Sequence, residues 1–135
     1  MDDCLFCKII AGEIPSQKVY EDEKTFAFLD INPVNHGHTL VVPKKHSENI
    51  YDIEESDWIA VMKTTKMLAS KIKEAVEADG INIEMNNDTA AGQIVFHTHV
   101  HIVPRIDDDG FRHWPGTPYK DRGAEEIAEK IRKLL

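Results

Sequence analysis

Phe96-His97-Thr98-His99-Val100-His101-Ile102-Val103-Pro104 is rich in β-branched residues, which favours a strand, and the rest of the domain is expected to form around it. Successive side chains of a strand point to opposite faces, so His97, His99 and His101 are expected on one face. The residues between them supply the apolar face. Each imidazole has two ring nitrogens that need partners when buried, so three in register indicate a functional site rather than packing.

A row of histidines fits two kinds of chemistry. Imidazole binds metal ions, and a neutral imidazole attacks an electrophile with its free lone pair near pH 7. The second kind suits phosphorus, because a phosphoryl group on an imidazole nitrogen passes readily to water. The residues of the row leave both kinds open.

The composition is that of an ordinary globular protein, with 41% hydrophobic and 30% charged residues, and residues 1–135 are expected to form one domain. A net charge of −8 argues against general nucleic-acid binding, which needs a basic surface. No apolar stretch approaches the roughly 20 residues of a membrane span, and no signal peptide opens the sequence. A cytoplasmic protein with no nucleic-acid or membrane partner is expected.

The two cysteines form the stretch Cys4-Leu5-Phe6-Cys7. A stable disulfide is not expected in a reducing compartment. The pair is therefore half of a metal site, a redox pair, or neither.

Local patterns predict the other elements. A short helix is expected at residues 8–15, strands at 18–20, 25–29, 38–43 and 81–85, a long helix from 53 or 54 to 78, and a last helix at 124–135. Asp52 and Glu55 resemble a capping box for the long helix, and Asp79-Gly80 supplies its stop. The apolar stripe of this helix is expected to be core: Trp58, Val61, Met62, Thr65, Leu68, Ala69, Ile72, Ala75 and Val76.

Three segments between these elements have open interpretations. Asp30, at the end of a strand, either recognises hydroxyl groups or caps a turn. The small residues of the loop 86–93 let backbone N–H groups approach an anion closely. Aromatic residues of the irregular segment 107–123 either cover a ligand or a dimer partner, or belong to a loop lying on the surface.

Residues 92–105 resemble the signature of the histidine triad family. The resemblance covers about residues 4–105 and points to the small, single-domain branch that contains nucleoside phosphoramidases. The other matching segments are Cys4-Leu5-Phe6-Cys7-Lys8-Ile9-Ile10, Glu13-Ile14-Pro15, Val19-Tyr20-Glu21-Asp22, Phe26-Ala27-Phe28-Leu29-Asp30-Ile31, and Gly37-His38-Thr39-Leu40-Val41-Val42-Pro43-Lys44-Lys45-His46.

The resemblance implies an α+β domain with a five-stranded antiparallel sheet, one long helix and one or two shorter helices. It implies a homodimer in which two sheets form one of ten strands. It also implies hydrolysis or transfer at the α-phosphate of a purine nucleotide, with nucleoside phosphoramidates or dinucleoside polyphosphates as substrates and a covalent nucleotidyl-histidine as intermediate.

Carried onto this sequence, the resemblance makes His99 the nucleophile, places His38 and His101 beside the α-phosphate, and gives His97 an orienting or bridging role. A main-chain carbonyl that accepts from the other ring nitrogen of His99 would fix the neutral tautomer that attacks. N–H donors of His38 and His101 would stabilise the charge that builds up on the phosphoryl oxygens.

The nucleotide-binding residues follow from the same resemblance. They are Asp30 at the ribose hydroxyls, Ile31 and Phe28 near the base, Asn86 near the ribose and leaving group, and Gln93 at the phosphate, beside His99 and His101. Family members often carry a polar residue where this chain has Ile94. General acid help is typically worth about 10²–10⁴-fold, so turnover is expected to be slower or to favour leaving groups that need little help.

Several prokaryotic relatives resemble this chain in an amino-terminal Cys-x-x-Cys that joins two histidines around zinc. The matching residues are Cys4, Cys7, His46 and His97, a closed set typical of a structural zinc site. The alternatives are an empty site or a reactive thiol pair.

Two further functions compete with the hydrolase. One is a nucleotide-binding or scaffold module with a zinc-stabilised fold and only incidental turnover. The other is a metalloenzyme in which His97, His99 and His101 all bind one metal ion.

Overall fold

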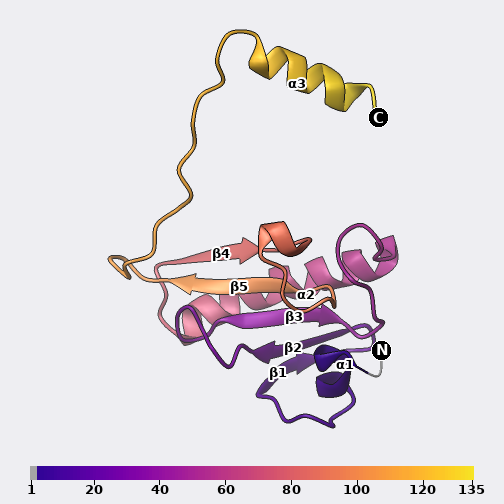
Figure 1. The fold of residues 1–135 in the computed structure, drawn as a ribbon. Coiled ribbons are helices and arrows are strands. Elements are labelled where there is room, and N and C mark those ends of the chain that lie inside the picture. The colour runs from indigo at the N-terminus through magenta and orange to yellow at the C-terminus, as the bar shows by residue number, and fades with distance from the viewer. Residues whose placement is uncertain (1–2) are drawn as a thin grey trace.

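The structure is a computed structural model and describes residues 3–135. It contains a five-stranded antiparallel sheet in the order β1-β2-β3-β5-β4, which confirms the predicted α+β fold. The elements are α1 Leu5–Ile10, β1 Lys18–Glu21, β2 Thr25–Leu29, β3 Thr39–Pro43, α2 Glu55–Ala75, β4 Gly80–Glu84, a 3₁₀ turn Thr89–Ala91, β5 Val100–Arg105 and α3 Gly123–Arg132 (Figure 1). Within the described part of the chain, no helix is long and apolar enough to cross a membrane.

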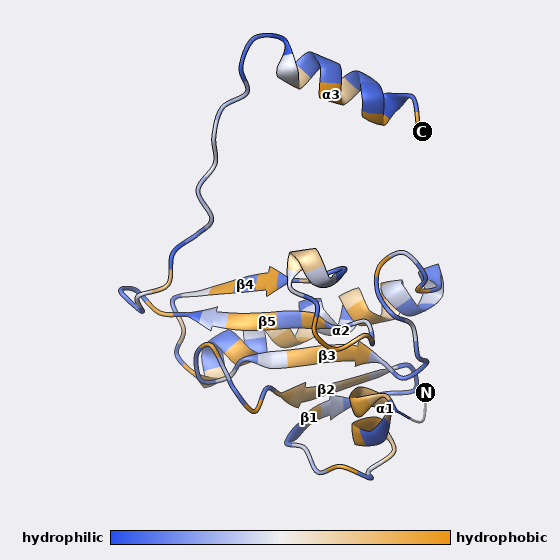
Figure 2. Cartoon of the chain, in the orientation of Figure 1, coloured by the Kyte–Doolittle hydropathy of each residue, from blue (hydrophilic) through white to orange (hydrophobic). Residues whose placement is uncertain are grey.

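The two faces of the sheet carry separate apolar clusters, as strand alternation requires. On β3, Val41 packs with the α2 cluster, whereas Leu40 and Val42 pack with the α1 cluster. The strands β2 and β3 are accordingly hydrophobic along most of their length (Figure 2). The long helix α2 packs across β2, β3, β5 and β4 on one face, and the short helix α1 covers only part of the other, so that face has room for a site.

The buried stripe of α2 is confirmed by Val61, Leu68 and Ile72, but the predicted N-terminal cap and the predicted C-terminal end of the helix are wrong. Asp52 does not cap it, because its carboxylate accepts from backbone N–H groups in the preceding turn. The helix ends at Ala75 rather than residue 78, because Glu77 adopts a left-handed backbone with φ of 54°.

The histidine stretch is not a strand throughout, which corrects the prediction for residues 96–99. Pairing of β5 begins at Val100. The carbonyl of Pro43, at the end of β3, accepts from the His97 ring at 2.8 Å instead of joining the ladder. The Thr98 N–H donates to Ser47 O at 2.8 Å, so residues 97–99 are held by loop contacts.

The C-terminal segment divides into a fixed base and a projecting arm. Arg105 pairs with Asp109 and donates to Phe111 O at 2.9 Å, which holds the chain against the sheet up to Phe111. From there residues 112–122, here called the arm, lead away from the sheet to α3 (Figure 1). The interpretation of residues 107–123 as a loop lying on the surface therefore holds only for the base of the segment, up to Phe111.

Candidate functional site

A cavity of about 520 Å³ opens on the face of the sheet that carries α1. Its volume lies within the roughly 300–1,000 Å³ of small-molecule sites. Apolar side chains from α1 and β2 line it together with the polar groups of Asp30, Asn86, His99 and His101. The cavity therefore suits a ligand with a flat apolar part and a polar or charged part.

His99 is held as a neutral imidazole with one nitrogen free. Its Nδ1–H donates to the carbonyl oxygen of His97 at 2.7 Å, which leaves the Nε2 lone pair unprotonated. Burial lowers the pKa of His99, so the ring is neutral at neutral pH. The Phe6 ring meets it edge-on, with centroids 5.0 Å apart. The main-chain carbonyl of His97 thus fixes the neutral tautomer of His99, as expected from the sequence.

A chain of hydrogen bonds fixes the protons of His38 and His101. The N–H of Val34 donates to His38 Nδ1 at 3.1 Å, so the proton of neutral His38 is on Nε2. That Nε2–H lies 2.9 Å from His101 Nδ1, and the proton of His101 is then on its own Nε2. His101 Nε2 is buried without a partner among the described residues. A ligand oxygen in the cavity would satisfy it.

Burial also keeps this pair neutral. It lowers the pKa of His38, and it lowers the pKa of His101 to about 4, with the neighbouring His99 and His38 adding to the effect. The rings of His99 and His101 lie 4.9 Å apart between centroids. A lone pair and an N–H donor therefore face one cavity side by side.

Asp30 caps a turn and also lines the cavity, and its recognition of hydroxyl groups stays a prediction. One carboxylate oxygen accepts from the N–H of Asn32 at 2.8 Å, which caps a turn. The other lies 3.7 Å from His38 Nε2, and Asp30 also lines the cavity. Phe28 is buried in the cavity wall, and Ile31 lies at its rim with 88% of its surface exposed.

Asn86 lines the cavity, but the structure does not bring Gln93 into it. The Gln93 amide nitrogen donates to Glu48 O at 2.7 Å and to Val95 O at 3.1 Å. Its oxygen accepts from the side chain of Asn49 and from the N–H of Asp88. With these four hydrogen bonds made and 3% of its surface exposed, Gln93 joins the loop 86–93 to residues 48 and 49, and its role at the phosphate stays a prediction.

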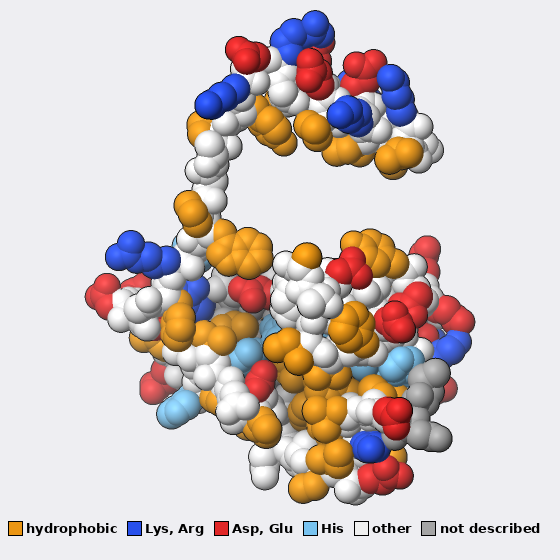
Figure 3. Space-filling model, in the orientation of Figure 1, with side chains coloured by type: hydrophobic (Ala, Val, Ile, Leu, Met, Phe, Trp, Pro, Cys, Tyr) orange, Lys and Arg blue, Asp and Glu red, His pale blue; other side chains and the backbone are white. Residues whose placement is uncertain are grey.

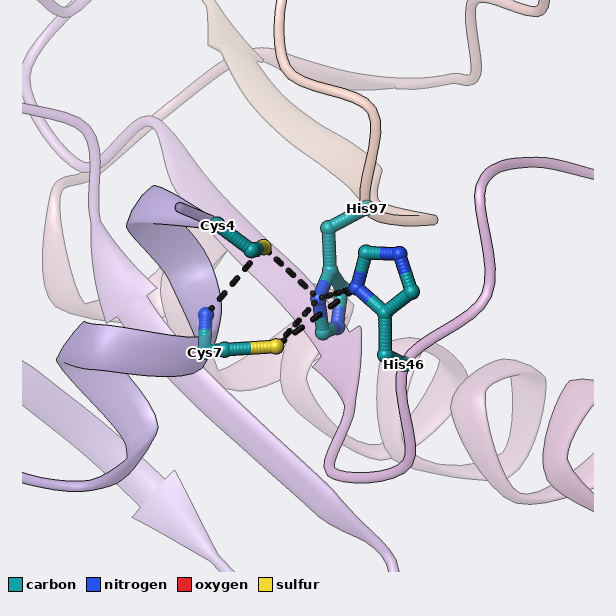
Figure 4. A group of neighbouring side chains, drawn as sticks. All are labelled: Cys4, Cys7, His46 and His97. Carbon is teal, nitrogen blue, oxygen red and sulfur yellow. Dashed lines mark hydrogen bonds between the residues drawn. The ribbon is translucent and has the colours of Figure 1, made fainter. Parts of the chain in front are cut away.

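Four side chains from three segments converge beside the cavity (Figure 4). Cys4 and Cys7 come from α1, His46 from the loop after β3, and His97 from the stretch before β5. The Nδ1 of His97 lies 3.4 Å from Cys4 Sγ, 3.5 Å from Cys7 Sγ and 3.2 Å from His46 Nδ1. The structure thus brings together the set that the resemblance implies.

Hydrogen bonding alone does not explain this cluster. His97 donates its Nε2–H to Pro43 O, so Nδ1 has a single lone pair for three neighbours. Ligands 2.0–2.3 Å from a tetrahedral zinc ion lie roughly 3.3–3.8 Å from one another, which is close to the spacing seen. Burial and Cys4 raise the pKa of Cys7 to about 11, and a bound cation would supply the charge that a thiolate needs. The four residues fit a closed zinc site.

The histidine stretch contributes to both the Cys4-Cys7-His46-His97 cluster, here called the metal cluster, and the cavity. The cluster takes His97, whereas the cavity takes His99 and His101. Among residues 3–135, the side-chain groups close enough to hold one ion are this cluster and Asp30, His38 and His101. His99 belongs to neither. A metal centre bound by His97, His99 and His101 together therefore gains no support.

The sequence analysis missed the part of the cavity wall made by α1. Leu5, Phe6 and Ile9 line the cavity, and Phe6 also contacts the rings of His97 and His99. The cysteine pair in the sequence could have indicated this part of the wall. If Cys4 and Cys7 bind the same ion as His97, the two residues between them must lie against the histidine stretch.

Comparison with known proteins places the chain in a family. Residues 11–108 match the HIT domain. The adenylylsulfatase HINT3 of Arabidopsis thaliana is 43% identical over 99% of this chain and 70% of its own length. The adenosine 5'-monophosphoramidase HNT1 of Candida albicans is 42% identical over 78% of this chain and 72% of its own length.

Solved structures agree with the fold. The crystal structure of SMU.412c from Streptococcus mutans is 44% identical, with a TM-score of 0.94 over 99% of this chain and 86% of its own. Residues 112–135 are about a fifth of this chain, and a superposition that misplaced them could not reach that score, so α3 projects similarly in both. A zinc-bound histidine triad protein from Mycobacterium smegmatis is 34% identical, with a TM-score of 0.78 over 98% of this chain and 96% of its own.

Proposed function

The chain belongs to the histidine triad family, and on that basis we propose that it is a hydrolase or transferase acting at the α-phosphate of purine nucleotides. The proposed substrates are nucleoside 5'-phosphoramidates and dinucleoside polyphosphates. Relatives named adenylylsulfatase and adenosine 5'-monophosphoramidase support nucleotide hydrolysis. The observation that carries the proposal is the fixed tautomer of His99, with its free lone pair beside the unpartnered N–H of His101.

In the proposed first step, the Nε2 lone pair of His99 attacks the α-phosphorus and the bond to the leaving group breaks. The Nε2–H of His101 donates to a non-bridging phosphoryl oxygen as negative charge builds up there. Ile94, at the mouth of the cavity and 88% exposed, has no group to protonate the leaving group. The leaving group then takes its proton from water at the open mouth.

In the proposed second step, water attacks the phosphorus and the bond to His99 Nε2 breaks, which releases a nucleoside monophosphate and restores the neutral imidazole. The proton of the attacking water leaves to solvent. Asp30 is proposed to accept hydrogen bonds from the ribose hydroxyls, and Phe28 with the apolar residues of α1 to hold the base. The neutral His38 and His101 pair keeps its donor in place in both steps.

Cys4, Cys7, His46 and His97 are proposed to hold a structural zinc ion, which would tie α1 to the catalytic stretch. The fit of the four donors and the zinc-bound relative support this assignment. A homodimer, with a ten-stranded sheet formed through a sheet edge, and a cytoplasmic location complete the proposal.

A nucleotide screen with mass spectrometry of the trapped covalent adduct tests the proposal. The expected result is a nucleotidyl group on the peptide that contains His99, and release of a nucleoside monophosphate. Hydrolysis without any adduct on that peptide would contradict the mechanism. Nucleotide binding without hydrolysis of any substrate would favour the binding or scaffold module.

A further inference from the structure

The helix α3 lies apart from the domain that carries it. No residue of α3 is buried, and within the described chain no hydrogen bond or ion pair joins residues 112–135 to residues 3–111. The space-filling view shows an open gap between this helix and the domain (Figure 3). Other contacts must therefore explain why the chain is helical there.

One side of α3 is apolar. Ile127 and Ile131 on α3, and Leu134 two residues past its end, follow each other at spacings of four and three residues and are exposed by 42%, 55% and 89%. This side faces the gap, whereas the lysine, arginine and acidic side chains lie on the other side (Figure 3). Isolated helices shorter than about 12–15 residues are marginal in water, so this 10-residue helix needs a surface to cover its apolar side.

The direction of the arm is set by a rigid base. The Arg105 guanidinium donates to both carboxylate oxygens of Asp109, at 2.8 and 2.9 Å, to Asn82 Oδ1 at 2.8 Å and to Phe111 O. Asn35 adds a bond to Asp109 at 3.0 Å. The matching position of α3 in the S. mutans crystal structure agrees with a built-in projection.

The arm leaves the domain along β4, the outermost strand of the sheet. Arg112, His113 and Trp114 line a groove together with residues of β4, and Trp114 is 90% exposed. In the order β1-β2-β3-β5-β4, one edge of β4 has no neighbouring strand, and Ile83 on it is 44% exposed. A second copy that joined this edge would lie beneath the arm.

The length of the arm fits that neighbour. Eleven extended residues span roughly 35–40 Å, and a domain of about 110 residues is about 35 Å across. The arm is thus long enough to reach across a domain of that size. A stable interface needs about 800 Å² from each partner, which a five-residue strand edge alone does not provide and an exchanged helix would supplement.

From these observations we infer that α3 and the arm clasp a second copy of this chain, each copy covering the other's exposed apolar surface. The exchange is reciprocal, so both α3 helices are buried in a closed pair with no other protein needed. The inference rests on the proposed homodimer and is independent of the proposed chemistry.

Crosslinking of mixed isotopes tests which copy α3 touches. Unlabelled and ¹⁵N-labelled full-length chains are refolded together and treated with an amine-reactive crosslinker, and links from Lys130 and Lys133 to lysines of residues 3–111 are examined. Links that join labelled to unlabelled peptides are expected. Links only within one isotope mean that α3 folds back on its own domain and overturn the inference, while a dimeric mass would leave the homodimer standing.

Sedimentation of variants tests the apolar side of α3. Ile131→Asp is expected to weaken the dimer by at least about tenfold, because a charge replaces a central contact. Lys133→Gln makes the same change in net charge on the opposite side of the helix and is expected to leave the dimer unchanged. Equal dimer affinities for the two variants would overturn the inference, as would a monomeric wild-type chain, and circular dichroism would verify that both variants are folded.

Discussion

His97 and His99 are separated by a single residue, yet their side chains lie in different sites because different main-chain carbonyls hold their rings. His97 donates its Nε2–H to Pro43 O and turns Nδ1 to the cysteine cluster. His99 donates its Nδ1–H to His97 O and keeps Nε2 free beside the cavity. The backbone acceptor, rather than the spacing of the histidines, therefore decides which nitrogen of each imidazole is free.

The two ends of the row are also coupled. The carbonyl that holds the His99 ring belongs to His97, whose side chain lies in the metal cluster. Any shift of His97 therefore moves the acceptor of His99. The predictions below separate the two ends or test their coupling.

The largest effect is expected from His99→Ala. Removal of the nucleophile should lower turnover by at least about 10³-fold, whereas nucleotide affinity should stay within a few-fold because the cavity wall remains. Steady-state kinetics and calorimetric titration with a nucleoside monophosphate measure the two quantities. His36→Ala, at an exposed histidine, is the control. Residual turnover near the wild-type rate would remove His99 from the mechanism.

Loss of the proposed metal site is expected to lower mainly the stability of the fold and, to a smaller extent, turnover. Cys7→Ser, or treatment with a chelator, is expected to lower the unfolding free energy by about 3 kcal/mol, a fall of roughly 10 °C in melting temperature, because a structural metal site is lost. Turnover should fall as well, since His97 O positions His99. Zinc analysis, thermal melting and rescue by added zinc check this. An unchanged melting temperature in metal-free protein would refute a structural ion.

The buried His101 in the cavity is expected to make stability depend on pH. The pKa of His101 is about 4 in the folded protein and about 6.5 when unfolded, so the unfolded chain binds the proton first as pH falls. Stability should therefore decline from pH 6.5 toward pH 4, with up to about 3 kcal/mol due to this group. His101→Gln should make the decline shallower in denaturant titrations, and His113→Gln, at an exposed site, should not.

The smallest effect is expected at Ile94. Ile94→Ser places a hydroxyl at the cavity mouth and should raise turnover of substrates with poor leaving groups by no more than about tenfold, because the site is open and water already protonates there. Ile94→Ala, which shortens the side chain without a hydroxyl, is the matched control. Equal rates for both variants would show that leaving-group protonation does not depend on this position.

Most of the fold was predictable because its signals are local. Strand alternation in Thr39–Pro43 and the apolar stripe of Glu55–Ala75 depend only on neighbouring residues. The end of α2 was not predictable from Gly80, since a left-handed Glu77 ends the helix earlier. The strand expected at residues 96–99 failed because side-chain contacts with Pro43 and Ser47 replace ladder pairing there.

In the site, residue types alone pointed to the histidine row and to the cysteine pair as sources of chemistry, because few other roles account for clustered imidazoles and thiols. The roles of His99 as nucleophile, Asp30 at the ribose and the zinc set came from the resemblance and stay predictions. Gln93 was expected at the phosphate; the structure places it outside the cavity lining, with four hydrogen bonds to Glu48, Asn49, Asp88 and Val95.

The amino-acid sequence by itself thus determined the strands, the long helix and the reactive side chains, since each follows from periodicity or from the chemistry of a residue type. Tertiary contacts alone decided which nitrogen of each imidazole is free, that α1 walls the cavity, and that α3 projects on its arm. The physical reason is that a tautomer or a direction depends on a partner distant in sequence: Pro43 O for His97, and Asn82 for the Arg105 that anchors the arm.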